Sequence, residues 1–342
     1  MQNVVIAGFG FMGGMHAQVY KLLEKATLVG VIDQDKETAQ ARLDGLGMEA
    51  RVYGTLEEAL EKEAFTVLDI CLPTDLHAEW AVKAAAAGKH LFCEKPLALK
   101  QDDGEMIAEA VEKAGVFVQV GHCIRFWPEY VALRDFIQSE EAGKLRSLSL
   151  QRRGGRPGYS VEDWLNDATR SGGAALDLHI HDTDFVLNLF GIPKAVRSKA
   201  TVDYSGPSHI FTSYQYEDIV VEAEGGWDYP ANWGFQMAFQ AIFENGAVEY
   251  DSNAQATLKV TIGEEEGKPM PFEQPVSNDS STGEGNIQSL GGYYNELAYF
   301  IDCVETDHAP EIATLSQARH SLNTTLEEIR SAREEQTIII NS

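Results

Sequence analysis

The sequence predicts an α/β protein of two domains, in which a parallel sheet covered by helices precedes an open, mainly antiparallel sheet. Over about the first 120 residues, apolar β-rich segments alternate with segments of helix length, which is the order of βαβ units. From about residue 144, strands of period two follow one another with few helices between them. A chain of 342 residues also exceeds one ordinary core. We therefore expect a first domain over residues 1–122 and a second over residues 123–342.

In the first domain we expect parallel strands at five apolar segments, VVIAG, TLVGVID, TVLDICLP, KHLFCEK and VFVQVG. Segments that are apolar throughout are typical of strands buried on both faces. The helix that follows the first strand is marked by Met12, Met15, Val19 and Leu22.

In the second domain the expected strands are SLSLQRR, IFTSYQYE, IVVEAEGGW and FQMAFQAIF. The last places Phe235, Met237, Phe239, Ala241 and Phe243 on one face. One face of this sheet should pack on helices while the other stays open. Open sheet faces are a common place for subunits to meet, so we expect a homodimer or homotetramer formed through this sheet.

The end of the chain predicts a long surface loop, two helices and a final strand. The loop covers residues 263–286, which are rich in Gly, Pro, Ser and acidic residues. The apolar stripes are Tyr293, Leu297, Phe300 and Val304 in the first helix, and Leu315, Ala318, Leu322, Leu326 and Ile329 in the second. The strand is TIIIN.

Composition excludes several classes of partner. A net charge of −26 argues against nucleic acids and anionic membranes, which attract Lys and Arg. The four cysteines form no CxxC pair, which favours reduced thiols. Neither a signal-peptide pattern nor an apolar run approaching the roughly 18 residues of a membrane span is present in the sequence. We expect a cytoplasmic protein.

The first strand runs into Gly8, Gly10 and Gly13 with GxGxxG spacing, opens a helix, and precedes a second strand ending at Asp33. This context predicts a Rossmann dinucleotide-binding domain. Gly8 permits the tight turn, Gly10 lets the backbone approach a pyrophosphate, and Gly13 lets the helix lie close to the sheet.

The cofactor predicted from this turn is NAD. Phe11 and Met12 would supply backbone N–H groups to the phosphates, and Asp33 would accept hydrogen bonds from the ribose while repelling a 2′-phosphate. Alternatively, the glycines serve a turn alone and Asp33 caps a helix beginning near Lys36. Lys36 and Arg42 could also assist a phosphate, so NADP stays as the less favoured cofactor.

Residues 171–184, SGGAALDLHIHDTD, carry a polar stripe on an apolar helix. Asp177, His181, Asp184 and Asn188 follow at spacings of four, three and four. Buried ionisable groups cost free energy unless they are paired or used, and we interpret the stripe as the reactive centre. A satisfied Asp–His pair that pins the helix is the structural alternative. A metal site among Asp177, His179, His181, Asp182 and Asp184 is another, but only Asp177, His181 and Asp184 converge, and we expect no metal.

KHLFCEKPLAL places Glu94, Lys95 and Pro96 at a carboxyl edge of the parallel sheet, where open α/β folds bind ligands. Lys95 would then face the crevice. The alternative is a solvated turn lysine followed by a proline that starts a loop.

Four motifs, GFGFMG, PTDLH at 73–77, GKHLFCEKP at 88–96 and SGGAALDLHIHDTD, match in order and separation over nearly the whole chain. Together they resemble the Gfo/Idh/MocA family of sugar and inositol oxidoreductases. The resemblance implies a Rossmann domain followed by an α/β domain with an open antiparallel sheet. It also implies NAD- or NADP-dependent oxidation of a secondary hydroxyl of a sugar, polyol or inositol-like substrate.

The resemblance also implies roles for individual residues. It makes Lys95, Asp177 and His181 catalytic, places Trp164 beside the substrate, and suggests a cis peptide before Pro96. It adds to the cofactor site Pro73, Thr74 and His77, together with Glu94 and Lys95. His179 departs from the family, where many members have glycine, and its role stays open between substrate contact and structure.

The chemistry predicted is proton removal from a hydroxyl whose carbon gives hydride to the nicotinamide. His181 suits proton transfer because its ordinary pKa lies near about 6.5. Asp177 would orient the imidazole, and Lys95 would stabilise developing alkoxide charge. The sequence does not decide between His181 and Lys95 as the group that takes the proton.

Other aromatic and basic residues could bind a polyhydroxylated ligand, and Arg125, Tyr159 and Trp164 are our candidates. The wider set includes Trp127, Arg152 and Arg153, and several arginines together would admit a phosphorylated or carboxylated sugar. Two alternative functions remain at this level: an NAD-dependent glycosidase that oxidises its substrate transiently and then eliminates, and a non-catalytic NAD-binding sensor. The intact Lys95, Asp177 and His181 argue against the sensor.

Overall fold

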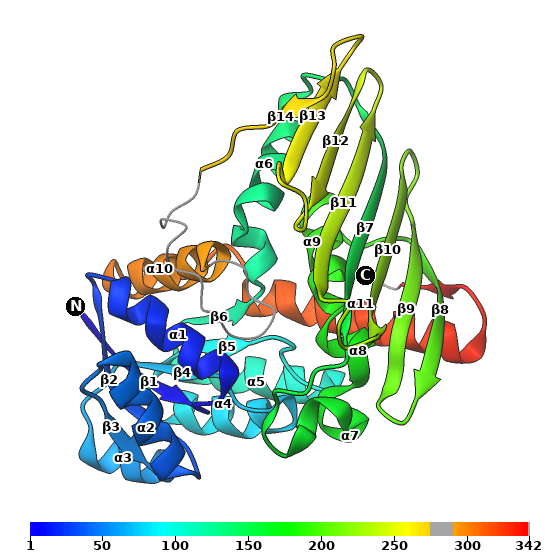
Figure 1. Cartoon of the computed structure of the whole chain (residues 1–342). Helices are drawn as coiled ribbons and strands as arrows, with labels where there is room; N and C mark the ends of the chain where they lie inside the picture. The colour runs from blue at the N-terminus through cyan, green and yellow to red at the C-terminus, as the bar shows by residue number, and fades with distance from the viewer. Residues whose placement is uncertain (274–289, 341–342) are drawn as a thin grey trace. The chain divides into compact units, whose positions relative to one another are not determined.

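The computed structural model describes residues 1–273 and 290–340, and the chain divides into two compact units. The first unit contains residues 1–123, 159–164 and, within the described part, 290–319. The second contains residues 124–158, 165–273 and 320–340. Figure 1 labels the helices and strands of both.

A six-stranded parallel sheet forms the centre of the first unit. Its strand order is β3-β2-β1-β4-β5-β6, the order of a Rossmann fold. The strands are β1 (Gln2–Ala7), β2 (Ala26–Ile32), β3 (Arg51–Tyr53), β4 (Val67–Ile70), β5 (His90–Glu94) and β6 (Val118–Gly121). The five apolar segments all form strands as predicted, whereas three-residue β3 is too short to leave a pattern in the sequence.

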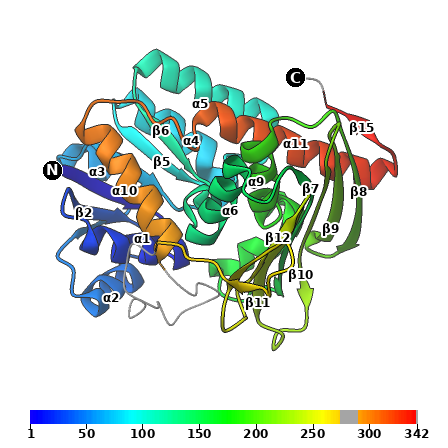
Figure 2. The same ribbon diagram turned by 90° about the horizontal axis from the view of Figure 1, so that it is seen from above.

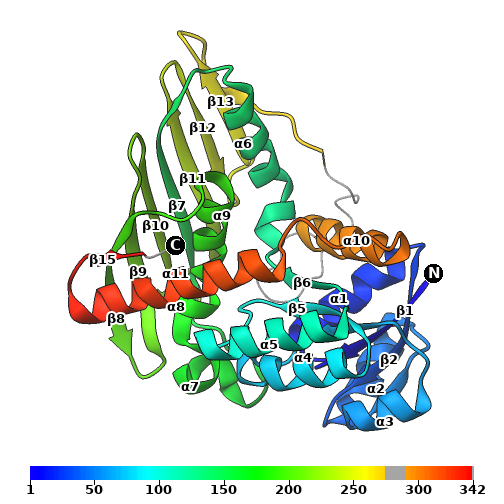
Figure 3. The same cartoon turned by 180° about the vertical axis from the view of Figure 1, so that it is seen from behind.

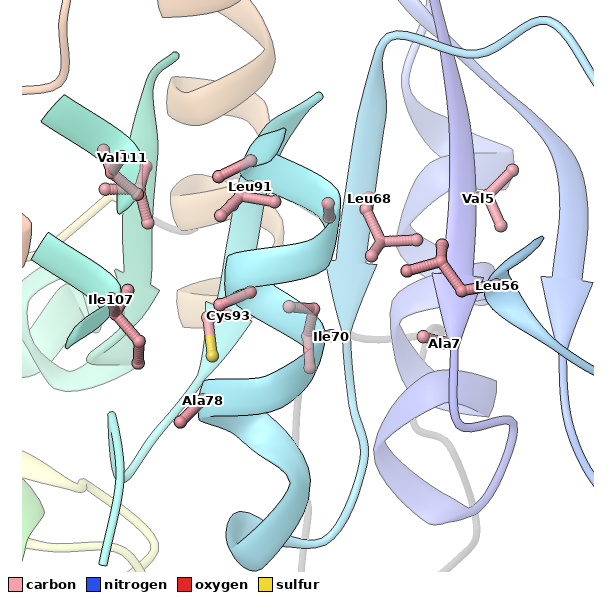
Figure 4. Packing of buried hydrophobic residues seen from close by; sticks show 14 of the residues in the cluster. Val5, Ala7, Leu56, Leu68, Ile70, Ala78, Leu91, Cys93, Ile107 and Val111 are labelled. Carbon is pink, nitrogen blue, oxygen red and sulfur yellow. The ribbon is translucent and has the colours of Figure 1, made fainter. Parts of the chain in front are cut away.

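Helices cover both faces of this sheet because alternate strand residues point to opposite sides. Val5 packs among residues of α3 (Leu56–Lys62), α4 (His77–Ala86) and α5 (Gln101–Ala114), as the cluster in Figure 4 shows. Val4 packs on the other side among residues of α1 (Phe11–Leu22), α2 (Lys36–Leu46) and α10 (Gly291–Glu305). Figure 3 shows α4 and α5 side by side, and Figure 2 shows α10 along α1.

Helix α10 corrects the expected division of the chain. The sequence assigned everything after residue 122 to the second domain, but α10 buries Leu297 and Phe300 in the core of the first unit. The first turn of α11 (Leu315–Glu334) also belongs to that unit, and Ala318 packs in its other core cluster. An amphipathic stripe shows that a helix has a buried face, but it does not show which sheet that face covers.

The second unit is built on a sheet of nine described strands in the order β14-β13-β12-β11-β7-β10-β9-β8-β15. Only β7 and β10 pair in parallel among them. The strands are β7 (Leu145–Gly155), β8 (Ala195–Asp203), β9 (Gly206–Gln215), β10 (Val220–Tyr229), β11 (Phe235–Phe243), β12 (Gly246–Asp251), β13 (Leu258–Ile262), β14 (Lys268–Pro269) and β15 (Ile338–Ile339). The mainly antiparallel sheet is confirmed, and β8, β12, β13 and β14 were not among the predicted strands.

One face of this sheet is apolar and the other is polar, as the period-two pattern predicts. Phe239 and Phe243 of β11 meet the rings of Tyr130 and Phe136 from α6 (Pro128–Ser139) edge to face. Gln240 of the same strand belongs to the opposite, polar face, with Ser149 and Gln151 of β7. Figure 1 shows the twisted sheet with α6 and α9 beside it.

The expected loop at 263–286 is only partly described. Its residues 268–269 form β14, which was not predicted, and residues 274–286 lie outside the described residues. Within the described residues, each helix is either too short or too polar to cross a membrane.

Replacement of Leu68, which is fully buried in β4 (Figure 4), tests the packing of the first core. Leu68→Ala should lower the free energy of unfolding by about 2–5 kcal/mol, because it removes apolar contacts and leaves a cavity. Leu22→Ala is the control, since Leu22 at the end of α1 is 45% exposed despite its place in the predicted stripe. Urea unfolding followed by circular dichroism measures both, and equal losses would contradict the burial.

Candidate active site

The glycine turn between β1 and α1 is built on close backbone approaches. Gly8 has a φ of 86°, and a Cβ there would lie 2.7 Å from the carbonyl oxygen of Cys71. A Cβ at Gly13 would lie 2.1 Å from the carbonyl oxygen of Gly8. Gly10, the residue before α1, faces open space, because its Cβ would meet no atom within 4 Å. The turn therefore leaves the amino end of α1 open to an anionic ligand.

Asp33 follows β2 and is tied to the glycine turn. Its Oδ2 accepts a hydrogen bond of 2.9 Å from the backbone N–H of Phe9, and its Oδ1 accepts one of 2.9 Å from that of Asp35. The N-cap of α2 is Asp35, whose side chain accepts from the N–H of Thr38. The alternative that Asp33 caps this helix is therefore wrong.

The two cations that could have assisted a 2′-phosphate have partners of their own. Lys36 pairs with Glu58 at 3.0 Å. Arg42 donates from Nη1 to the carbonyl oxygen of Phe9 at 2.8 Å. This arrangement favours NAD, because Asp33 places a carboxylate where NADP would need a cation.

The PTDLH segment is fastened to the lysine–proline turn by His77. The ring nitrogens of this fully buried histidine lie 2.8 Å from the carbonyl oxygens of Pro96 and Leu72. Burial lowers the pKa of the His77 imidazole despite these two carbonyls. Thr74, also buried, has an Oγ1 without a hydrogen-bond partner among the described residues.

Lys95 follows β5 at the carboxyl edge of the parallel sheet and is partly exposed. The Lys95–Pro96 peptide is cis, as the resemblance suggested. Glu94, in contrast, turns inward and is 4% exposed. Its Oε2 accepts from the backbone N–H of Lys95 at 3.2 Å.

In the second unit, the predicted helix of the polar stripe is divided into two. Helix α8 (Gly173–Asp177) ends and α9 (Ile180–Phe190) begins across residues 178–179. The N–H groups of Leu178 and His179 both donate to the carbonyl of Ala174, and that of Asp182 donates to the carbonyl of His179. The local change of hydrogen-bond spacing means that Asp177 and His181 are not separated by one regular helical turn, which corrects the single helix expected from the spacing.

Two members of the stripe bind an arginine. Arg125 donates from Nε and Nη2 to the two carboxylate oxygens of Asp184, at 2.7 and 2.8 Å, and from Nη1 to Asn188 at 3.1 Å. Ser321 of α11 donates to the same carboxylate at 2.7 Å. Arg125 is 4% exposed, and these contacts fasten its guanidinium to α9, while its contact with substrate stays a prediction.

The remaining buried polar residues near α9 are also paired. Arg152, a pocket candidate in the sequence, donates to both oxygens of Asp182 at 2.9 and 3.0 Å. His179 is fully buried with its Nε2 2.9 Å from Glu328 Oε2. These contacts favour the structural role for His179.

His181 is 8% exposed at the start of α9, and Asp177 is the last residue of α8. Tyr159 is 44% exposed and packs on Phe11 with 4.8 Å between ring centroids. Trp164 is partly buried in the turn at residues 161–166. Tyr159, Trp164 and Lys95 belong to the first unit, and Arg125, Asp177 and His181 belong to the second.

Sequence reasoning missed several buried ionisable residues, among them His16, Asp69, Glu296 and Glu328. A signal existed for His16, because it lies four residues after Met12 and three before Val19, on the apolar face of α1. Glu296 directly precedes Leu297, which is a residue of the predicted apolar stripe of α10. Its position in the sequence does not show whether the glutamate is buried or solvated.

Comparisons with known proteins agree with this fold. Residues 2–122 match the oxidoreductase family with an NAD-binding Rossmann fold, and residues 130–273 match the Gfo/Idh/MocA C-terminal domain. The inositol 2-dehydrogenase of Rhizobium meliloti is 26% identical over 311 residues, 88% of each chain. That of Arthrobacter sp. is 31% identical over 259 residues, 72% of each chain. A solved levoglucosan dehydrogenase, in complex with NADH and levoglucosan, has the same fold, with a TM-score of 0.82 at 20% identity over 100% of both chains.

The glycine turn, the carboxylate at the end of β2 and the mixed second sheet define a two-domain, NAD-binding oxidoreductase. The chain belongs to the Gfo/Idh/MocA family. Its residues fit NAD, because Gly10 leaves room beside the amino end of α1 and Asp33 is a carboxylate at the ribose position.

Gly13→Ala should lower the affinity for NAD by at least about tenfold, because the new methyl group would displace α1 from the carbonyl of Gly8. Gly14→Ala is a matched control in the same helix, since its Cβ would meet no atom within 4 Å. Titration of the intrinsic fluorescence with NADH measures both. Equal affinities in the two variants would contradict the proposed cofactor site.

Arg125→Met should lower the free energy of unfolding by about 3–5 kcal/mol, because it leaves the Asp184 carboxylate buried without its cation. The double variant Arg125→Met with Asp184→Leu should recover part of that loss, since both charges are then removed. Lys194→Met, which removes an exposed partner of Glu217, should change the midpoint of unfolding little. A single variant as stable as the wild type would contradict the buried pair.

Proposed function

We propose that the protein oxidises a secondary hydroxyl of a sugar, polyol or inositol-like molecule with NAD. The observation that carries the proposal lies in the first unit, where the glycine turn follows β1 and Lys95 follows β5. Both are therefore at the carboxyl edge of one parallel sheet, which is where such folds bind ligands. The curated inositol 2-dehydrogenases that match the sequence support the substrate class.

Bound NAD supplies the acceptor for the hydride of the substrate carbon. In this proposal His181 accepts the proton of the hydroxyl, and Asp177 orients the imidazole and stabilises its charged form. The Lys95 ammonium donates a hydrogen bond to the same oxygen and stabilises the negative charge that develops there. The alternative, in which Lys95 takes the proton, predicts a different pH dependence of kcat in the variants below.

The proposed cofactor residues divide by the part of NAD that they would contact. Phe11 and Met12, with Gly8, Gly10 and Gly13, would hold the pyrophosphate, and Asp33 the adenosine ribose. The segment of Pro73, Thr74 and His77, together with Glu94 and Lys95, would lie near the nicotinamide. The unpartnered Oγ1 of Thr74 supports a polar ligand group there, whereas His77 and Glu94 would act through the turns that they fasten.

Substrate oxidation is tested by incubating the protein with NAD and a panel of sugars, inositols and sugar acids. NADH absorbance should rise with at least one polyhydroxylated compound and should rise less with NADP. Release of an aglycone from a glycoside at constant NADH absorbance would instead identify the glycosidase.

Lys95→Ala and His181→Ala should each lower kcat by about 10²–10⁴, and His181→Ala should change the affinity for NADH little. The pH profile separates the two roles: if His181 is the base, the rise of kcat with pH that reports its titration disappears in His181→Ala and remains in Lys95→Ala. Retention of most of the wild-type kcat by Lys95→Ala would refute the proposed chemistry.

We also propose a cytoplasmic homo-oligomer that meets through the open face of the second sheet. Phe211 and Ile242 are 50% and 45% exposed, and polar side chains such as Gln151 and Glu222 line the same face. The four cysteines are free thiols, which supports a reducing compartment, and the excess of acidic residues supports a small-molecule partner over nucleic acid or membrane. Light scattering should give a multiple of 37.7 kDa. A mass of one chain would contradict the proposed assembly.

A further inference from the structure

A group of buried ionisable side chains lies in the first unit, between α1, α10 and the sheet. We call it the His16 cluster, and it consists of His16 (α1), Asp69 (β4), Glu94 (β5) and Glu296 (α10), together with the partly buried Cys71. His16, Asp69 and Glu296 are fully buried, and Glu94 is 4% exposed. None of the roles assigned above uses His16, yet its ring touches the residue that precedes Lys95.

The His16 ring lies between two carboxylates. Its Nδ1 is 2.8 Å from Asp69 Oδ2, and its Nε2 is 3.2 Å from Glu94 Oε1. The first contact is a hydrogen bond, and the second has the distance of an ion pair without good hydrogen-bond alignment. A neutral imidazole has one N–H and can serve one carboxylate, whereas an imidazolium serves both.

The charges of the cluster agree with an imidazolium. Burial by itself lowers the pKa of His16, but the Asp69 carboxylate outweighs it together with Cys71, and the pKa is raised well above its ordinary value. Burial raises the pKa of the Cys71 thiol and that of the Glu296 carboxyl, which the Glu94 charge raises further. The His16 ring therefore lies where a positive charge would face the carboxylates of both Asp69 and Glu94.

Glu94 connects the His16 ring to the turn at Lys95 and Pro96. Its Oε1 faces His16, while its Oε2 accepts the backbone N–H of Lys95. The neighbouring strand leaves room for the carboxylate only because residue 121 is glycine: a Cβ there would lie 2.8 Å from Glu94 Oε1. The carboxylate is thus held from three sides, by α1, by the Lys95 backbone and by β6.

We propose that His16 is a positioning residue, which fixes the Glu94–Lys95 turn relative to the helix that opens the dinucleotide turn. The helix that begins at the glycine turn also carries, in its second turn, the group that holds the residue before Lys95. The placement of the lysine thereby depends on the same helix as the placement of NAD. This inference rests on the proposed role of Lys95 in the reaction.

Nuclear magnetic resonance of protein labelled with ¹⁵N histidine tests the charge without any loss of activity. The two ring nitrogens of His16, assigned by their disappearance in His16→Gln, should show the shifts of an imidazolium at pH 7 and above, well past the ordinary pKa of about 6.5. A neutral tautomer at pH 7 would overturn the proposal.

His16→Asn and Glu94→Gln test the link to Lys95. Asparagine keeps a donor for Asp69 but cannot reach Glu94. Each variant should lower kcat by about ten- to a hundredfold, because a small misplacement of a catalytic group is costly. In His16→Asn, KM and the dissociation constant of NADH should change by less than about threefold. The kcat of the double variant should be no lower than that of the less active single variant, because each substitution removes the same contact between His16 and Glu94.

Val19→Ala is the matched control, because Val19 is fully buried on the same helix and outside the cluster. It should lower stability and leave kcat unchanged. A wild-type kcat in His16→Asn would refute the link, as would additive losses of kcat in the double variant. If a variant in the activity test fails to fold, the labelled wild-type protein still reports the charge of His16. Should Lys95→Ala retain its kcat, the proposed function fails while the imidazolium reading stands, so the two failures are distinguishable.

Discussion

The close approach of α1 to the end of β1 is the constraint on which the cofactor-binding unit depends. A side chain at Gly13 would begin 2.1 Å from the carbonyl oxygen of Gly8, so the helix can reach this position only with glycine there. The approach aims the first N–H groups of α1 outward and carries His16 into the interior, where it meets Asp69 and Glu94. One packing contact thus positions both the amino end of the helix and the buried His16 ring.

The second unit fixes helix α9 by a different means. Helix α9 carries Asp182 and Asp184, which are fully buried and paired with Arg152 and Arg125 in two-pronged ion pairs. Buried ion pairs add little net stability because desolvation offsets their attraction. Their directional hydrogen bonds allow few other orientations of the helix, and we infer that they fix the direction of His181, which shares this short helix with both aspartates.

Periodicity predicted most of this fold, and the misses have common physical causes. Continuous apolar runs and period-two strands identified both sheets because burial on two faces or on one leaves a distinct pattern. β3 has only three residues, and β12 and β13 bury alternate residues over only six and five residues, which is too short a stretch for a distinct pattern. Helix α10 was assigned to the wrong unit, because its stripe of Leu297 and Phe300 records burial but not the partner.

The sequence predicted which residues belong to the candidate site better than it predicted the partners that each side chain contacts. The glycine spacing and Asp33 were readable because the dinucleotide turn imposes local geometry. The pairing of Arg125 with Asp184 was not predicted, because the two residues are distant in sequence. His16 was overlooked because a histidine within an apolar stripe gives no sign of the carboxylates that it meets.

A crystal structure of the protein with NADH and a polyol inhibitor tests the central claim most directly, that Lys95 and His181 act on one hydroxyl. The account predicts that Lys95 Nζ and a ring nitrogen of His181 both lie within about 3.2 Å of the same ligand oxygen. Its carbon should lie about 3–3.5 Å from the nicotinamide ring. A complex in which either group lies more than about 10 Å from that oxygen would contradict it.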